Sequence, residues 1–144
     1  MKFVVYVSQA KKPFQSNELS LLLEHSRIRN SKDKITGLLI YRFNSEFSRG
    51  NFVQILEGPE AAIDDVWQRI SSDSRHHTII TLEAGKAEDR MFSDWSMGFR
   101  NVDADDLKGF EGFSDLGSDN FWNQANLSAK TDALELLKSF YDGA

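Results

Sequence analysis

Residues 35–58 read ITGLLIYRFNSEFSRGNFVQILEG, and this stretch decides the fold. Ile35 to Tyr41 and Asn51 to Leu56 are rich in β-branched and aromatic residues, which predicts two strands. The polar sequence NSEFSRG, at residues 44–50, joins them and suits the turn of a β-hairpin. Gly58 and Pro59 then end the second strand and start a helix, because proline is well tolerated in the first turn of a helix.

The flanking segments add one clear helix and one helix of mixed character. The helix after Pro59 has apolar side chains at helical spacing, at Ile63, Val66, Trp67 and Ile70. Before the hairpin, Ser16 is the predicted N-cap of a helix. Its inward positions are Leu19, Leu22, Leu23, Ser26 and Asn30. Two polar side chains therefore share the apolar face of the earlier helix.

Three more strands are predicted, at residues 3–7, 78–82 and 95–99. The element order is then β, α, β, β, α, β, β. This order predicts an α+β fold, the ferredoxin-like βαββαββ sandwich, with two helices on one face of a five-stranded mixed sheet. The first and third strands are expected to be central neighbours in that sheet.

The remaining C-terminal part predicts helical structure rather than a second domain. Asp103 to Lys108 predicts a short helix and Ser128 to Tyr141 a longer one. We expect residues 1–100 to form the main domain and residues 101–144 to form a helical extension. The extension is expected to pack on the sheet face that the two main helices leave uncovered.

Composition excludes several classes of function. The chain has 144 residues, a formal net charge of −5 and no basic stripe, which argues against nucleic-acid binding. It has no cysteine, so disulfides, thiolate metal sites, thiol nucleophiles and a cysteinyl flavin adduct are all excluded. The N-terminal apolar run stops at Ser8, too short for a signal peptide, and no long apolar stretch follows. We expect a cytoplasmic protein without a membrane segment.

Tyr6 and Gln54 lie halfway along the first and third predicted strands, so their side chains are expected to meet. Gln54 shares a face with Phe52 and Leu56, the face that the helices should cover. A buried amide without a hydrogen bond costs about 1 to 3 kcal/mol, so Gln54 needs a partner. A simple core hydrogen bond between tyrosine and glutamine explains this pair equally well. With Ser26 and Asn30 above it, the interior also suits a planar ligand that forms hydrogen bonds.

Each charged residue near the end of the second helix has two interpretations, one as a ligand contact and one as an ordinary surface or helix-end charge. Arg69 and Asp73 are four residues apart beside the apolar stripe, but Asp65 and Arg69 can also form a surface ion pair. The cations of Arg75, His76 and His77 offset the helix dipole without any ligand. His25 is expected to lie far from the histidine pair, so no metal site is predicted. Trp95 and Met97 share one side of the fifth strand, a pattern that also fits an ordinary core.

Five segments of the chain are similar to the BLUF domains, blue-light sensors that use FAD. They are VVYVSQA, SRIRNSKDKITGLLIY, FVQILEG, RISSDSRHH and RMFSDWSMGF, which together cover about the first hundred residues in order. The resemblance implies that an isoalloxazine ring lies between the two helices over the sheet. It implies flavin contacts from Ser26, Arg29, Asn30, Gln54, Arg69, Asp73, Arg75 and His76. Arg29 stands where the family often has histidine or asparagine, and the loop before Phe52 is longer than usual.

The resemblance further implies a photoreceptor that binds FAD, or FMN or riboflavin in its place, noncovalently. Light then exchanges hydrogen bonds between Tyr6 and Gln54, and Trp95 and Met97 carry the change to the fifth strand. The expected partners are a downstream signalling protein and a second copy of the chain. Two alternatives remain open: a regulatory module for a colourless ligand, and a small flavin or phosphate enzyme. Against the enzyme, the sequence has no nucleophile elbow, no phosphate-binding glycine loop and no second domain for a nicotinamide.

Overall fold

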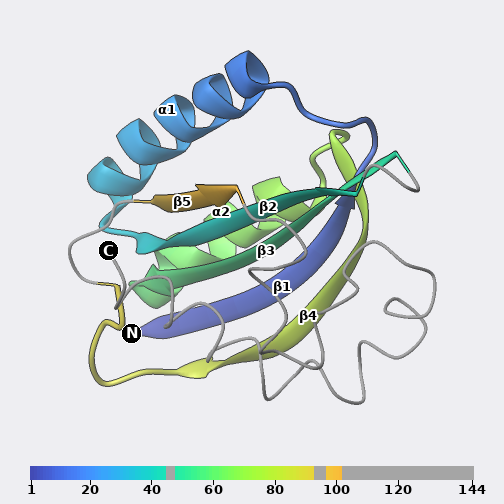
Figure 1. Cartoon of the computed structure of the whole chain (residues 1–144). Coiled ribbons are helices and arrows are strands. Elements are labelled where there is room, and N and C mark those ends of the chain that lie inside the picture. Colours follow the sequence, from blue (N-terminus) through green and yellow to red (C-terminus); the bar gives the residue numbers. More distant parts are fainter. Residues whose placement is uncertain (45–47, 93–96, 102–144) are drawn as a thin grey trace.

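The computed structural model describes residues 1–44, 48–92 and 97–101. The elements in chain order are β1 (Lys2–Ala10), α1 (Ser16–Asp33), β2 (Thr36–Asn44), β3 (Arg49–Gly58), α2 (Glu60–Ser71), β4 (His76–Lys86) and β5 (Gly98–Asn101). The strands form one sheet in the order β4-β1-β3-β2-β5 (Figure 1). β5 pairs with β2 in parallel, and the other neighbours are antiparallel. The predicted ferredoxin-like order is confirmed, with β1 and β3 adjacent.

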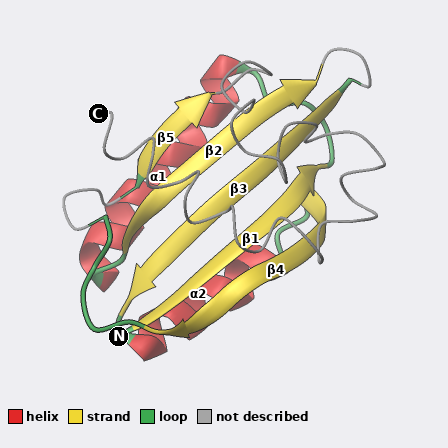
Figure 2. Cartoon of the chain, turned by 60° about the horizontal axis from the view of Figure 1, so that its bottom comes forward, coloured by secondary structure: helices red, strands yellow, loops and turns green. Residues whose placement is uncertain are grey.

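Both helices cover the same face of the sheet, as Figure 2 shows. Side chains from α1, α2 and the alternate positions of the central strands form the core on this face. Its buried members are Val4, Tyr6, Ala10, Leu19, Leu23, Ile35, Leu39, Tyr41, Phe52, Leu56, Ile63, Val66 and Met97. Strand alternation puts Gln54 among them, between Phe52 and Leu56, as the sequence predicts. The helix-covered face is therefore mainly apolar, with Gln54 and Ser8 as buried polar side chains of the sheet.

The hairpin that the sequence indicates is present, with Asn44 opposite Arg49. Several boundaries differ from the predictions. The helix α1 begins at Ser16 itself and its N-cap is Gln15, whose backbone N–H donates to Glu18 Oε1 at 3.2 Å. β1 continues to Ala10 and β4 continues to Lys86, because the two strands are hydrogen-bonded to each other beyond their apolar residues. Propensity alone therefore places the ends of these elements too early.

The fifth strand begins at Gly98 rather than at residue 95, so Met97 precedes it. Trp95 lies outside the described residues. The predicted helices at Asp103 to Lys108 and Ser128 to Tyr141, and with them nearly all of the predicted extension, also lie outside them.

The second face of the sheet is buried as well. Val5, Val7, Ile40, Val53 and Ile55 are each fully buried and, by alternation, point away from α1 and α2. No helix of the described ranges has the length and apolar character needed to cross a membrane.

Candidate functional site

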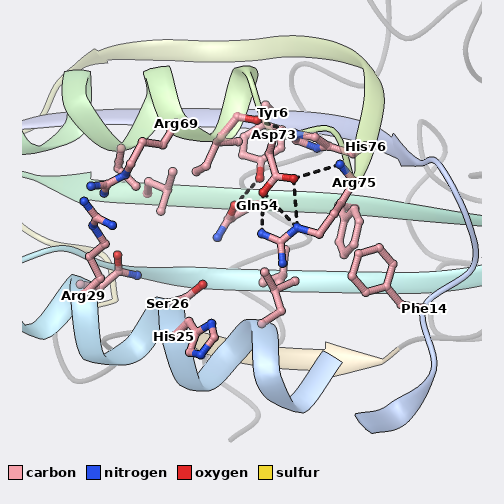
Figure 3. A pocket seen from close by; sticks show the side chains of 17 residues that line it. Tyr6, Phe14, His25, Ser26, Arg29, Gln54, Arg69, Asp73, Arg75 and His76 are labelled. Carbon is pink, nitrogen blue, oxygen red and sulfur yellow. Dashed lines mark hydrogen bonds and ion pairs between the residues drawn. The ribbon is translucent and has the colours of Figure 1, made fainter. Parts of the chain in front are cut away.

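A cavity of about 280 Å³ lies between α1 and α2, with β1, β2 and β3 beneath it (Figure 3). This volume is near the lower end of the range for small-molecule sites. The cavity is lined by all eight side chains that the resemblance assigns to the cofactor: Ser26, Arg29, Asn30, Gln54, Arg69, Asp73, Arg75 and His76. Tyr6 lines it too. Residues from α1, from the sheet and from the end of α2 thus meet at one place.

A chain of three hydrogen-bonded side chains begins on the floor of the cavity. Tyr6 and Gln54 are direct partners across the β1–β3 ladder. The Tyr6 hydroxyl donates a hydrogen bond to Gln54 Oε1, and Gln54 Nε2 donates to Met97 Sδ at 3.3 Å. All three side chains are buried. The predicted meeting of Tyr6 and Gln54 is confirmed, and the thioether, a weak acceptor, holds the donor end of the amide only loosely.

The phenol of Tyr6 is kept neutral by its surroundings. Burial raises its pKa well above the ordinary value, and the negative charge of Asp73 raises it further. The Tyr6 ring also packs edge-on against the Trp67 indole, with 5.1 Å between ring centroids. The hydroxyl therefore stays protonated and oriented toward Gln54 over the whole physiological pH range.

This shift makes a prediction about alkaline stability. An unfolded tyrosine loses its proton near pH 10, whereas folded Tyr6 keeps it, so the folded state binds more protons above that pH. Stability contributed by this difference is fully present below pH 10 and is lost as the pH rises further. We expect the urea midpoint of Tyr6→Phe to fall less between pH 9 and pH 11 than that of the wild type. If the urea midpoints of the two proteins fall by the same amount over this pH range, the raised pKa of Tyr6 is contradicted.

The helix α1 contributes one wall through its last two turns. Asn30 is almost fully buried, and its backbone carbonyl accepts a hydrogen bond from the Ile35 N–H at 2.8 Å. Ser26 is half-buried one turn earlier, whereas Arg29 is exposed and reaches over the cavity from the same helix (Figure 3). His25 lines the cavity as well, from α1, across the cavity from His76 (Figure 3).

The opposite wall comes from the segment after α2. Arg75 Nη2 donates to Asp73 Oδ2 at 2.5 Å, and Arg75 Nε lies 3.0 Å from both Asp73 oxygens. These hydrogen bonds from Arg75 hold the pKa of the Asp73 carboxyl below its usual value. The pair presents a fixed anion and a fixed cation to the cavity.

His76 connects this wall to β1. Its Nε2 lies 2.5 Å from the Ile70 carbonyl oxygen, so Nε2 carries the proton, and its Nδ1 lies 2.9 Å from Ser8 Oγ. His77 turns away, is exposed and contacts Thr78 Oγ1 at 2.8 Å. The two histidines therefore point to opposite sides, as strand alternation predicts. No group of three metal-ligating side chains occurs within the ranges that the structure describes.

Arg69 both lines the cavity and forms an ion pair within α2, the two interpretations that the sequence left open. Its Nη1 lies 3.1 Å from Asp65 Oδ2, the ion pair within α2, and its Nη2 lies 3.9 Å from Asp33 Oδ2 at the end of α1. Nη2 is buried and has no hydrogen-bond acceptor among the described side chains and backbone. A buried donor without an acceptor is costly, so this nitrogen suits a ligand oxygen. With the amides of Asn30 and Gln54, the cavity fits a flat ring that bears carbonyl oxygens.

Comparisons with known proteins point to one family. The family model "BLUF: Sensors of blue-light using FAD" matches residues 1–98. The photoactivated adenylate cyclase subunit beta of Euglena gracilis is 33% identical over 95 residues, which cover 65% of this chain and 10% of that protein. The blue light- and temperature-regulated antirepressor BluF of Escherichia coli strain K12 is 25% identical over 140 residues, 95% of this chain and 32% of that protein. This chain thus spans about a tenth of the cyclase subunit and about a third of the antirepressor.

Solved structures agree with the sequence comparison. BlrB, a BLUF protein in its dark state, superposes with a TM-score of 0.67 at 27% identity, over 92% of this chain and 96% of that chain. The photo-activated state of BlsA gives a TM-score of 0.68 at 27% identity, over 95% of each chain. Together with the tyrosine–glutamine pair on the cavity floor, these likenesses show that the chain belongs to the BLUF family of flavin-binding blue-light photoreceptors.

Proposed function

We propose that this chain binds FAD noncovalently between α1 and α2 and converts absorbed blue light into a changed hydrogen-bond pattern that another protein reads. The observation that carries this proposal is the buried chain from the Tyr6 hydroxyl through the Gln54 amide to Met97 Sδ. We expect FMN and riboflavin to replace FAD, because all three carry the isoalloxazine ring that this proposal places between the two helices. The chain itself acts as a sensor and catalyses no reaction.

The binding residues we propose divide by wall: Ser26, Arg29 and Asn30 from α1, Gln54 from β3, and Arg69, Asp73, Arg75 and His76 from α2 and its end. Asn30 and Gln54 offer both donor and acceptor atoms, as the ring edge of a flavin requires. The buried Nη2 of Arg69 gains an acceptor when a ligand oxygen reaches it. The chain has no cysteine, which excludes a cysteinyl–flavin bond and supports noncovalent binding by these side chains.

A bound flavin that has absorbed blue light supplies a strong oxidant at the cavity floor. Tyr6 gives up an electron and then its phenolic proton, which moves along the hydrogen bond to Gln54. Both return to Tyr6, so the net redox change is zero. The Gln54 side chain is left rotated or tautomerised, because its amide has a donor end and an acceptor end that can exchange partners. A new hydrogen bond from Gln54 to a ring carbonyl then accounts for a red-shifted absorption.

The output leaves through Met97, whose sulfur contacts Gln54, and we include Trp95 from the family resemblance. We propose that residues 101–144 form a helical extension on the sheet face opposite α1 and α2, and that a downstream protein or a second copy reads it. Relatives support an output of this kind, since the names of two of them describe a photoactivated cyclase subunit and a light-regulated antirepressor. We also propose that the protein works in the cytoplasm, without nucleic acid or membrane as its direct partner.

The decisive experiment is an absorption spectrum before and after blue light. We expect the purified protein, reconstituted with FAD, to be yellow and to show a red shift that reverses in the dark. A protein that stays colourless after reconstitution contradicts the proposal and favours a colourless-ligand module. Turnover of an added substrate under illumination favours the enzyme alternative.

A binding measurement tests the role of Arg69. We expect Arg69→Gln to weaken FAD binding about tenfold, since a hydrogen bond from a charged donor contributes at least about 1.5 kcal/mol. Titration of FAD, FMN and riboflavin, followed by flavin fluorescence, shows which part of the ligand Arg69 contacts. A loss shared by riboflavin assigns Arg69 to the ring or ribityl chain, and a loss confined to FMN and FAD assigns it to phosphate.

The matched control is Lys32→Gln, an exposed cation in the last turn of α1 that does not line the cavity. This variant should bind all three flavins as the wild type does. Equal affinities of Arg69→Gln and the wild type for all three contradict the assigned role.

A further inference from the structure

The connection between β4 and β5 is fixed to the sheet at its first end. Glu57, at the end of β3, is fully buried. Its carboxylate accepts hydrogen bonds from the Thr36 hydroxyl at 2.9 Å, the Met91 N–H at 2.8 Å and the Phe92 N–H at 2.7 Å. A buried carboxylate with three donors is a stable anchor, because each donor compensates part of the cost of removing the charge from water.

Arg90 reinforces the same anchor. Its Nη1 donates to Thr36 Oγ1 at 2.9 Å and to the Glu57 carbonyl oxygen at 3.2 Å, and its Nη2 donates to the Lys34 carbonyl oxygen at 2.6 Å. Residues 90–92 are therefore held against the paired ends of β2 and β3. We call this cluster of Thr36, Glu57 and Arg90 the Glu57 anchor. The first end of the β4–β5 connection is therefore fixed to the sheet.

Met97 is held from two other directions. Its sulfur accepts from Gln54 Nε2 at 3.3 Å, and its backbone carbonyl accepts from Arg27 Nε at 2.9 Å. Arg27 belongs to α1, one turn before Asn30 and seventy residues from Met97 in the chain. The same residue thus joins the amide on the cavity floor to the helix that forms the cavity wall. The guanidinium is a charged donor, which makes its hydrogen bond roughly twice as strong as a neutral one.

We propose that Arg27 is a positioning residue that ties the Met97 backbone to α1, so that a reorientation of the Gln54 amide reaches α1 through the Met97 carbonyl. The inference rests on the proposed function, because it uses the Gln54 switch as its input. The switch is the two-state element that a claim of coupling requires, and Met97 is the contact that both the switch and Arg27 share.

The three methionines make the dark-state part of this inference measurable. They are Met1 at the N-terminus, Met91 at the Glu57 anchor and Met97 at Gln54. Their side-chain methyl groups, labelled with ¹³C, give three assignable NMR signals in the protein without flavin and in the FAD-loaded protein kept in the dark. We expect Arg27→Gln to move the Met97 signal and to leave the Met91 signal in place in both samples. Lys32→Gln, the matched substitution of an exposed cation on the same helix, should move neither signal.

Illumination tests the relay itself. In the FAD-loaded wild type we expect blue light to change hydrogen exchange of the α1 amides around Arg27 by about tenfold, the factor that one hydrogen bond from a charged donor supplies. Arg27→Gln should keep the visible red shift and lose this response of α1. Arg27→Lys should restore part of it, because the ammonium group remains a donor but cannot offer the planar guanidinium geometry.

Each failure has a distinct signature. A wild type without a red shift rejects the proposed function, and the relay from Gln54 fails with it. With a normal red shift, an unchanged Met97 signal in Arg27→Gln rejects the positioning role. An α1 response in Arg27→Gln equal to that of the wild type, or no α1 response in the wild type, rejects the relay.

Discussion

Replacing Gln54 by alanine is expected to abolish the light-induced red shift while leaving flavin bound. The reason is that Gln54 is the only side chain that contacts both the Tyr6 hydroxyl and Met97 Sδ among the described residues. Without its amide, no group on the cavity floor can exchange donor and acceptor partners. Tyr6→Phe should have the same effect, because it removes the proton that the exchange needs. Difference spectra recorded before and after blue light measure the result.

The same strand offers a matched control. Asn51 lies on β3 three residues before Gln54 but points to the opposite face, and its buried amide has no hydrogen-bond partner within the described part of the chain. Asn51→Ala therefore removes a primary amide from the same strand without touching the cavity, and we expect it to keep the full red shift. A normal light state in Gln54→Ala or in Tyr6→Phe means that other residues carry the photochemistry.

Replacing Glu57 by alanine is expected to lower the free energy of unfolding by about 3 kcal/mol or more, because each of three buried donors left without its acceptor costs about 1 to 3 kcal/mol. The substitution leaves the Thr36 hydroxyl and the Met91 and Phe92 N–H groups buried without their acceptor. Such a loss is a large fraction of the total stability of a domain of this size. Urea unfolding of the protein without flavin, followed by circular dichroism, measures it.

Two further variants distinguish the effect of the buried Glu57 carboxylate on stability from the effect of an exposed acidic charge. Glu57→Gln keeps one acceptor oxygen and should lose less stability than Glu57→Ala. Glu60→Ala removes an exposed carboxylate from the first turn of α2, and we expect a change of at most about 1 kcal/mol, the usual size of a helix-dipole effect. Equal unfolding midpoints for Glu57→Ala and the wild type contradict the anchor.

The sheet and its two helices could be predicted from local patterns. The apolar spacing of Ile63, Val66 and Ile70 indicates α2, and the β-branched runs indicate β2 and β3. The ends of the strands were harder to predict, because pairing with a neighbour extends a strand beyond its apolar residues. β4 begins at His76, two residues before its predicted start at Thr78, for this reason. Tertiary hydrogen bonds decided these boundaries, and no local window contains them.

The cavity floor was predictable because it follows from strand order and alternation. Once β1 and β3 are neighbours, the midpoints of the two strands place Tyr6 opposite Gln54. The family resemblance assigned the eight lining residues to flavin binding. The composition of the chain only excluded other classes of site, such as thiolate metal sites. Their individual contacts with flavin remain predictions.

The residues that sequence patterns missed are those whose partners lie far away in the chain. Glu57 reads as an ordinary charged residue at a strand end, yet its partners are at positions 36, 91 and 92. Arg27 reads as a solvent-exposed cation, and its acceptor is seventy residues distant. Charge and spacing along the chain carry no signal for such contacts.

The position of β1 between β4 and β3 also has a consequence for how the chain folds. The β2–β3 hairpin needs only a short loop to close, and hairpins of this kind form within microseconds. β1 is synthesised first, but it pairs with β3 and β4, whose partner residues lie about 40 to 85 positions further along the chain. Such distant pairing is slow, because the entropy of closing the loop is lost before the contacts form. Because Tyr6 of β1 and Gln54 of β3 both line the cavity, the flavin site is complete only once β1 has found its register on β3.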